Sequence, residues 1–228
     1  MTSTIVVGGS GGIGRVIAQH FAARGNEVVI TSRDKARADT VAAEVGGSTR
    51  GLALDLSRPE TLEASLAEVA AVDNLVISAA NPTPITLAAF DVAEAVKAVT
   101  VKLVGYAETV RVLHDRLSPG AAVVLFGGLA KERPYPGSTM VTTFNAGITG
   151  LTRTLALEIA PHRVNALHPG LIGDSPRWRD VPEPPHSTDT PIGRLVTMQE
   201  VAEAIDFLLT NGGINAQDLY LDGGLMAT

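Results

Sequence analysis

Cysteine is absent from this sequence of 228 residues. Its absence excludes disulfide bonds, thiolate nucleophiles and thiolate metal sites, and it agrees with a reducing compartment, so we expect the protein to be cytoplasmic. Histidine is also sparse. The five histidines are scattered and none falls in an HExxH pattern, so no metal site is expected.

Clusters of positive charge and long apolar runs are also absent. Eighteen Lys and Arg residues against 24 Asp and Glu residues give a formal net charge of −6, and no segment concentrates the basic residues. We therefore expect neither nucleic acid nor a membrane as a partner. No apolar run approaches the ~20 residues of a membrane-spanning helix, and the first residues, MTSTIVVGG, do not resemble a signal peptide.

Hydrophobic residues make up 45% of the chain and fall in short runs that alternate with longer helical patterns. Nearly continuous apolar runs are typical of parallel strands that helices cover on both faces. Such runs occupy residues 4–8, 27–32, 51–55, 74–78, 121–126, 163–167 and 218–222, with helical patterns at 12–24, 58–69, 88–116 and 139–159. This alternation predicts one α/β domain over residues 1–228, a doubly wound parallel sheet of about seven strands.

One segment, residues 173–191, reads as a long irregular loop. It holds five of the 13 prolines and lies around the only tryptophan, Trp178. Loops of this length in a compact domain usually act as lids or binding loops. We expect a substrate lid, and the alternative is a passive surface loop anchored by Trp178.

A glycine-rich turn separates the first strand from the first helix. Gly8, Gly12 and Gly14 let the backbone turn tightly and approach a pyrophosphate, whose charge then lies at the helix N-terminus. Ser10 and Ile13 lie within the same turn. A turn of this composition between a strand and a helix predicts a dinucleotide site.

The end of the second strand indicates which dinucleotide binds. NAD-binding proteins of this kind usually carry a carboxylate there for the ribose hydroxyls, whereas this chain reads Ser32-Arg33. A guanidinium and a hydroxyl suit a phosphate, which favours NADP(H) over NAD(H). Asp34 is expected to cap the next helix. The alternative for Arg33 is a solvated surface charge.

These motifs resemble those of the short-chain dehydrogenase/reductase family over nearly the whole chain. The family's Gly-x-x-x-Gly-x-Gly loop matches the glycines above, and Asp55-Leu56 resembles its pair near the adenine ring. Further similar stretches are RVNALHPG at 163–170, GRLVTMQEVAEAIDFLL at 193–209 and LYLDGG at 219–224. The resemblance implies a Rossmann-like fold, oxidoreductase chemistry with NADP(H), and a homo-tetramer or homo-dimer.

The family's catalytic Asn, Ser, Tyr and Lys do not have counterparts in this alignment. The Tyr-x-x-x-Lys positions fall on Val141 and Asn145, and the Ser position falls on Gly127 or Gly128. The Asn position falls on Lys102. The family's Asn-Asn-Ala-Gly segment is replaced by Ile77-Ser78-Ala79-Ala80, of which Ala79 and Ala80 are expected to line the cofactor site.

Relative to the family, Lys and Asn thus exchange places. Lys102 stands at the family's Asn position on one helix, and Asn145 stands at its Lys position on the neighbouring helix. A buried lysine beside a cofactor can have a lowered pKa and donate a proton. The alternative is a structural hydrogen bond between the two side chains. Tyr135 and His168 are other candidates near the site, for which packing roles are the simpler interpretation. Ser138 and Thr139 fit the start of a helix.

The sequence therefore predicts an NADP(H)-dependent oxidoreductase acting on a small carbonyl or alcohol substrate. Lys102 would supply the proton and Asn145 would orient it or the ribose. Two alternatives remain open: a non-redox isomerase or lyase that uses Lys102, and a catalytically silent NADP-binding protein.

Overall fold

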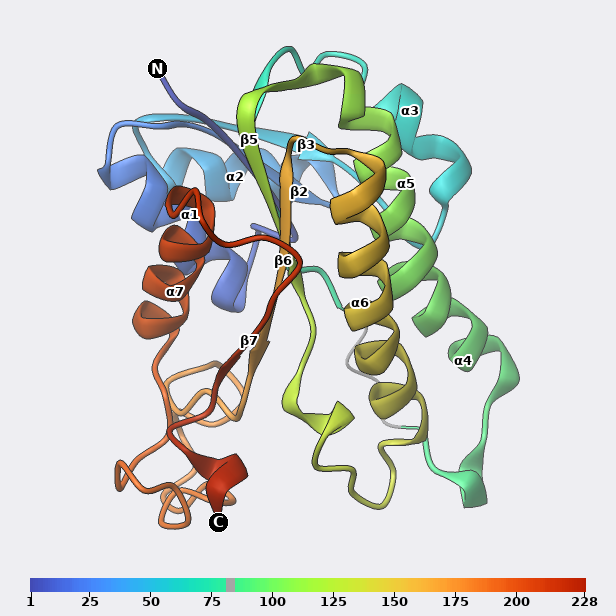
Figure 1. The fold of residues 1–228 in the computed structure, drawn as a ribbon, viewed down its shortest axis with the longest axis vertical. Coiled ribbons are helices and arrows are strands. Elements are labelled where there is room, and N and C mark those ends of the chain that lie inside the picture. Colours follow the sequence, from blue (N-terminus) through green and yellow to red (C-terminus); the bar gives the residue numbers. More distant parts are fainter. Residues whose placement is uncertain (81–84) are drawn as a thin grey trace.

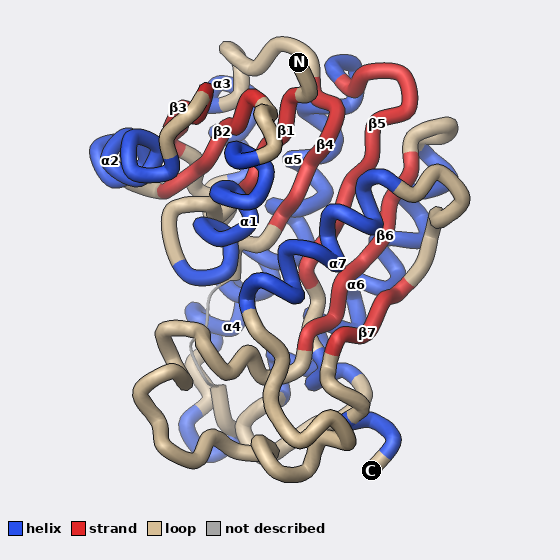
Figure 2. Tube along the Cα trace, turned by 90° about the vertical axis from the view of Figure 1, so that its left-hand side faces the viewer, coloured by secondary structure: helices blue, strands red, loops and turns tan. Residues whose placement is uncertain are grey.

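The computed structural model describes residues 1–80 and 85–228. Its centre is a seven-stranded parallel sheet in the order β3-β2-β1-β4-β5-β6-β7 (Figures 1 and 2). The strands are β1 Ser3–Val7, β2 Glu27–Ser32, β3 Ser48–Ala53, β4 Val72–Ile77, β5 Leu117–Phe126, β6 Arg163–Pro169 and β7 Asp218–Leu221. The predicted doubly wound α/β sheet is confirmed, because each predicted strand is present with ends that differ by a few residues.

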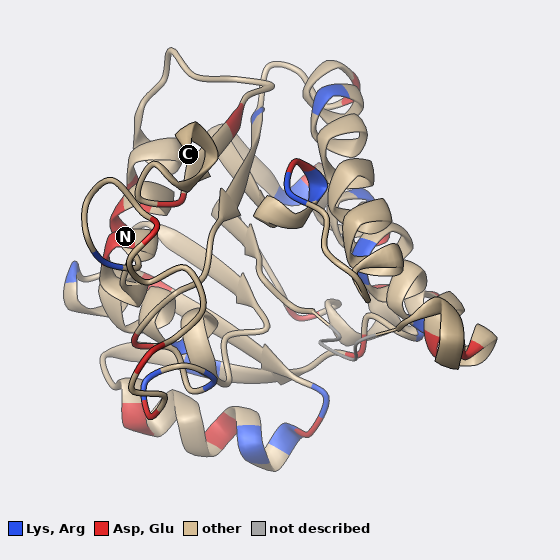
Figure 3. Cartoon of the chain, turned by 90° about the horizontal axis from the view of Figure 1, so that it is seen from below, with Lys and Arg blue, Asp and Glu red and all other residues tan. Residues whose placement is uncertain are grey.

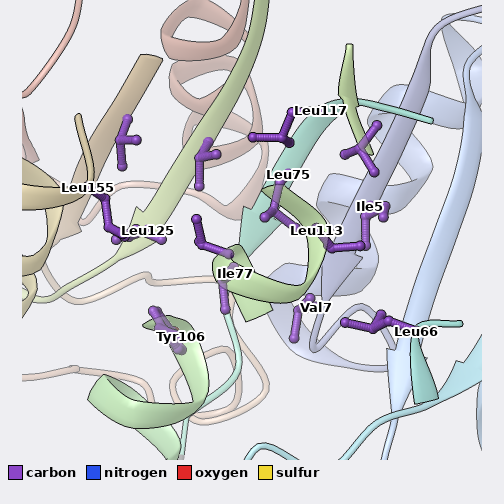
Figure 4. Packing of buried hydrophobic residues seen from close by; sticks show 14 of the residues in the cluster. Ile5, Val7, Leu66, Leu75, Ile77, Tyr106, Leu113, Leu117, Leu125 and Leu155 are labelled. Carbon is purple, nitrogen blue, oxygen red and sulfur yellow. The ribbon is translucent and has the colours of Figure 1, made fainter. Parts of the chain in front are cut away.

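Helices cover both faces of the sheet (Figure 1). One face carries α1 Gly12–Ala23, α2 Lys35–Val45 and α7 Met198–Thr210, and the other carries α3 Leu62–Ser65, α4 Val92–Val99, α5 Gly105–Leu113 and α6 Thr139–Glu158. Each layer has its own apolar core. Ile17, Phe21 and Ile205 belong to the first core, whereas Tyr106, Leu113 and Leu155 belong to the second (Figure 4).

Two predicted helices differ from those in the structure. The segment expected at 58–69 forms only a 3₁₀ turn, Pro59–Thr61, and the four-residue α3, because one turn already buries Leu62 and Leu66. The helix expected at 88–116 is interrupted by a π-helical turn, Thr100–Val104, between α4 and α5. Such turns inside helices frequently lie at functional sites.

The carboxyl ends of the strands face the end of the molecule that carries the long loops (Figure 1). Residues 173–191 contain neither a helix nor a strand, and their role as a lid stays a prediction. Figure 3 views this end and shows acidic and basic residues interspersed. Within the described ranges, no helix has the length and apolar character to span a membrane, and no group of three His, Asp or Glu side chains has an arrangement suited to a metal ion.

Candidate functional site: a cleft beside a buried lysine

A cleft of about 850 Å³ opens where β1, β2 and β4 end. All eleven residues predicted to bind a cofactor lie on its wall: Gly8, Ser10, Gly12, Ile13, Gly14, Ser32, Arg33, Asp55, Leu56, Ala79 and Ala80. The structure thus brings together segments from four different βα connections. Their role in binding stays a prediction.

The glycine turn is shaped as a cradle for a phosphate. Gly8 and Gly12 have φ values of 88° and 49°, which side-chain-bearing residues rarely adopt. A Cβ at Gly14 would lie 2.2 Å from the Gly8 carbonyl oxygen, whereas one at Gly12 would meet nothing within 4 Å. The chain therefore packs tightly behind the turn and leaves its front open, at the N-terminus of α1, where anions bind favourably.

The end of β2 presents positive charge to the cleft. Asp34 also lines the cleft, but its carboxylate caps α2, since it accepts hydrogen bonds from the backbone N–H groups of Ala36 and Arg37 at 2.8 and 3.3 Å. Arg33 and Arg37 both line the cleft, and neither forms an ion pair with a carboxylate in the described part of the chain. The Arg37 guanidinium reaches across to the Ser10 carbonyl oxygen at 3.3 Å.

Arg37 is a site residue that the sequence analysis missed. The available signal was its position on the helix that Asp34 caps, one turn after Arg33. Asp55, by contrast, was predicted, and its side chain is held by the Ser57 backbone N–H at 3.0 Å and the Ser57 hydroxyl at 2.7 Å.

Lys102 lies in the π-helical turn with only 3% of its surface exposed. Its Nζ donates to the Tyr106 hydroxyl at 3.1 Å, and that hydroxyl donates to the Ala79 carbonyl oxygen at 2.8 Å. Burial lowers the pKa of Lys102 to about 7 and raises the pKa of Tyr106. Tyr106 was not anticipated from the sequence, although the spacing of four residues places it on the same helical face as Lys102.

The suggested hydrogen bond between Lys102 and Asn145 is wrong, because the amine binds Tyr106 on its own helix. Asn145 is buried on α6, and its Oδ1 has no hydrogen-bond partner within the described residues. A Cβ at Gly128 would lie 2.6 Å from Asn145 Nδ2, so this amide fills the space of a side chain at Gly128. An unpartnered buried acceptor is costly, and a ligand hydroxyl would satisfy it.

His168 fills the corresponding space beside Gly127, where a Cβ would lie 2.1 Å from its Nδ1. Nδ1 accepts from the Gly128 N–H at 3.1 Å, so the ring proton lies on Nε2, 2.7 Å from Asp218 Oδ1. Burial lowers the pKa of His168. Both nitrogens are occupied and the side chain is fully buried, in agreement with the simpler interpretation of a structural histidine.

Tyr135 lies outside the dinucleotide cleft. Its side chain is exposed and lines a separate hollow of about 510 Å³ with Pro134 and Pro136. The expectation that Ser138 caps α6 is wrong at the level of the side chain. Ser138 occupies the position before the helix, but its hydroxyl accepts from the Tyr135 N–H at 3.0 Å and contacts the Thr142 hydroxyl at 2.9 Å.

The doubly wound sheet and the cleft at its glycine turn define a dinucleotide-binding α/β protein. Comparison with known sequences identifies the family. A family described as Enoyl-(Acyl carrier protein) reductase matches residues 8–226, and the chain belongs to the short-chain dehydrogenase/reductase family. It is an oxidoreductase-type protein of the class that uses NAD(P)(H).

Curated relatives are reductases of similar length. Carbonyl reductase family member 4 of Danio rerio is 31% identical, over 97% of this chain and 96% of the relative. A 3-oxoacyl-[acyl-carrier-protein] reductase of Mus musculus is 29% identical, over 98% of this chain and 97% of the relative.

Solved structures agree with the fold. A putative betaketoacyl-ACP reductase superposes with a TM-score of 0.89 at 27% identity, covering 100% of this chain and 98% of the other. The 3-ketoacyl-(acyl-carrier-protein) reductase from Brucella melitensis, solved as a complex with NADH, gives 0.87 at 28% identity, covering 99% and 98%.

Proposed function

We propose that this protein is an NADP(H)-dependent reductase of a small carbonyl substrate, with Lys102 as its proton-holding group. The observation that carries the proposal is the cleft, which combines an open glycine turn with two arginines that have no carboxylate partner among the described residues. A buried amine, that of Lys102, is linked to the Ala79 wall of this cleft through the Tyr106 hydroxyl. The names of the relatives, carbonyl reductase and 3-oxoacyl reductase, support a carbonyl as the substrate.

The choice of NADP(H) rests on Arg33 and Arg37. A 2′-phosphate carries close to two negative charges, and guanidinium groups bind phosphate oxygens in a planar, bidentate geometry. In a chain with a net charge of −6, two cleft-lining guanidiniums that have no ion-pair partner within residues 1–80 and 85–228 favour an anionic ligand. Ser32 and the loop around Ser10 supply further donors at the same end of the cleft.

The carbonyl chemistry needs a hydride and a proton. Bound NADPH would supply the hydride, which leaves the proton to the protein. We propose that Val141 and Asn145 occupy the family's Tyr and Lys positions, so that α6 supplies no acid there. Lys102 is a buried amine linked to the Ala79 wall through the Tyr106 hydroxyl, and its pKa of about 7 suits proton donation at neutral pH.

Asn145 has a supporting role in this proposal. Its unpartnered Oδ1 would accept a hydrogen bond from a ribose or substrate hydroxyl, which fixes the ligand without charge. The same proposal assigns residues 173–191 as the substrate lid, a homo-tetramer or homo-dimer as the assembly, and the cytoplasm as the location.

A second candidate, a silent NADP-binding protein, is favoured by the burial of the Lys102 amine. The Lys102 side chain is 3% exposed, and its amine donates to the Tyr106 hydroxyl rather than facing an open substrate site. The two candidates differ in turnover, not in binding.

Two measurements on the purified protein separate these candidates. NADPH and NADH are titrated by nicotinamide fluorescence, and NADPH oxidation is then followed across a panel of small ketones, aldehydes and 3-oxoacyl thioesters. The reductase assignment predicts NADPH binding and turnover of at least one carbonyl, with a loss of ~100-fold or more in Lys102→Met, the size typical of a lost general acid. NADPH binding without turnover of any substrate would favour the silent protein, and unchanged turnover in Lys102→Met would refute the assigned role of the lysine.

A further inference from the structure

The Tyr106 side chain is fully buried in the core between the sheet and α5 (Figure 4). A phenol in such a place is costly unless its hydroxyl is hydrogen-bonded. This hydroxyl makes two bonds, because it donates to the Ala79 carbonyl oxygen at 2.8 Å and accepts from Lys102 Nζ at 3.1 Å. One buried oxygen therefore connects the lysine of the π-helical turn to the segment that follows β4.

Ala79 lines the cleft, and its backbone also packs against the glycine turn. A Cβ at Gly8 would come within 2.8 Å of the Ala79 backbone nitrogen. The preceding residue is tied to the end of β1, since the Ser78 N–H and hydroxyl both reach the Val7 carbonyl oxygen, at 2.9 and 3.1 Å. A displacement of Ala79 would therefore move the surface on which the dinucleotide lies.

The Lys102 amine has no carboxylate to neutralise it in the described part of the chain. On α4, Lys97 and Glu94 lie 3.7 Å apart. On α5, Glu108 is bound by Arg111, and in the turn Pro59–Thr61, Glu60 pairs with Arg58. The stretch of α6 from Thr139 to Thr152 contains no ionisable side chain. The phenol oxygen is therefore the polar group that holds the amine.

We propose that Tyr106 is a positioning residue that joins Lys102 to the wall of the dinucleotide cleft, so that dinucleotide binding and proton binding at Lys102 are coupled. This inference rests on the proposed binding of NADP(H). The direction follows from electrostatics, because the phosphates of a dinucleotide beside Ala79 favour the charged form of a nearby amine. Dinucleotide binding then raises the proton affinity of Lys102, and by reciprocity a lower pH strengthens binding.

The expected size follows from linkage. Burial places the pKa of Lys102 at about 7 in the free protein. If binding raises this pKa by about one unit, NADPH binds more weakly at high pH. Its dissociation constant well above pH 8 is then about ten times its dissociation constant well below pH 7. At pH 7.5, complex formation then takes up about half a proton per site.

The test is isothermal titration calorimetry of NADPH into the full chain at pH 7.5, in two buffers that differ in ionisation enthalpy. The wild type is expected to take up protons. Lys102→Met keeps the bond from Tyr106 to Ala79, so it should retain NADPH affinity at high pH but show no proton uptake. Tyr106→Phe leaves both the amine and the Ala79 carbonyl without their partner, so it should lose proton uptake and also weaken NADPH binding about tenfold.

Thr109→Val is the matched control. Thr109 carries a fully buried hydroxyl on the same helix, and its hydrogen bond among the described residues is to the Gly105 carbonyl oxygen of that helix. This variant should keep the wild-type affinity and proton uptake, and thermal unfolding of every variant shows whether it is folded. If Tyr106→Phe proves unfolded, Lys102→Met alone still tests the coupling.

The outcomes separate this inference from the proposed function. NADPH binding with proton uptake but without turnover would support the coupling and contradict the reductase assignment. NADPH binding with the same proton uptake in wild type, Lys102→Met and Tyr106→Phe would overturn the coupling alone. Failure of NADPH to bind would overturn both.

Discussion

The substitution Arg37→Gln tests the NADP(H) assignment at a residue that only the structure identifies. Arg37 extends from the first turn of α2 to the Ser10 carbonyl oxygen, at 3.3 Å, and so lies against the glycine turn at the wall of the cleft. That distance is long for a hydrogen bond. Giving up this bond for a 2′-phosphate therefore costs little, and we expect the guanidinium to bind the phosphate of NADP(H).

The magnitude follows from the strength of charge-assisted hydrogen bonds, about 1.5–3 kcal/mol each. Arg37 is exposed, so screening by salt and water reduces this to about 1–2 kcal/mol. The dissociation constant of NADPH should therefore rise ~5- to 30-fold in Arg37→Gln. NADH has no 2′-phosphate, and its dissociation constant should change less than about twofold on the same argument.

The assay is a fluorescence titration with both nucleotides, repeated with adenosine 2′,5′-bisphosphate and 5′-AMP as competitors. Arg24→Gln is the control, because Arg24 is also an exposed arginine but ends α1 beside Asp206, outside the cleft. Equal losses of NADPH and NADH affinity in Arg37→Gln would refute the assignment of this end of the cleft to a phosphate. So would an unchanged NADPH affinity in the double variant Arg33→Gln/Arg37→Gln.

Two further predictions concern the turn and the histidine. Gly14→Ala should abolish measurable binding of either nucleotide, because its Cβ would lie 2.2 Å from the Gly8 carbonyl oxygen, and wild-type affinity in a folded variant would contradict the cradle geometry. His168 has a pKa lowered by burial, so the unfolded chain binds more protons than the folded one as pH falls below about 6.5. Thermal unfolding followed from pH 7.5 to 5 should show a stability loss that is smaller in His168→Gln, and an identical pH dependence would show that this histidine does not contribute.

Regular parts of the fold could be predicted from the sequence because the physics there is local. Buried parallel strands appear as apolar runs such as TIVVG and AAVVLF. Asp34 predicts the start of the helix after β2, because its side chain caps that helix. The glycine turn is equally predictable from the sequence, because a Cβ at Gly8 or Gly14 would collide with neighbouring backbone atoms. All the predicted cofactor residues consequently lie on one cleft.

The interior of the site could not be predicted because it depends on packing between helices. The pattern at 88–116 indicates one helix, and nothing local shows that it is interrupted by a π-helical turn at Lys102. Nor does the sequence show that the Lys102 amine binds Tyr106 rather than Asn145. Likewise, the fit of His168 beside Gly127 involves two strands and has no local sequence signal.

We propose that this chain transfers hydride from NADPH to a carbonyl while Lys102 supplies the proton. The most direct test incubates the protein with NADPH deuterated at the transferring C4 position and a carbonyl panel, and measures deuterium in the alcohol products by mass spectrometry. We predict deuterium on the carbinol carbon with wild type and a loss of ~100-fold or more in the rate of its appearance with Lys102→Met. The absence of deuterium from every product, under conditions where NADPH is bound, would contradict hydride transfer by this protein.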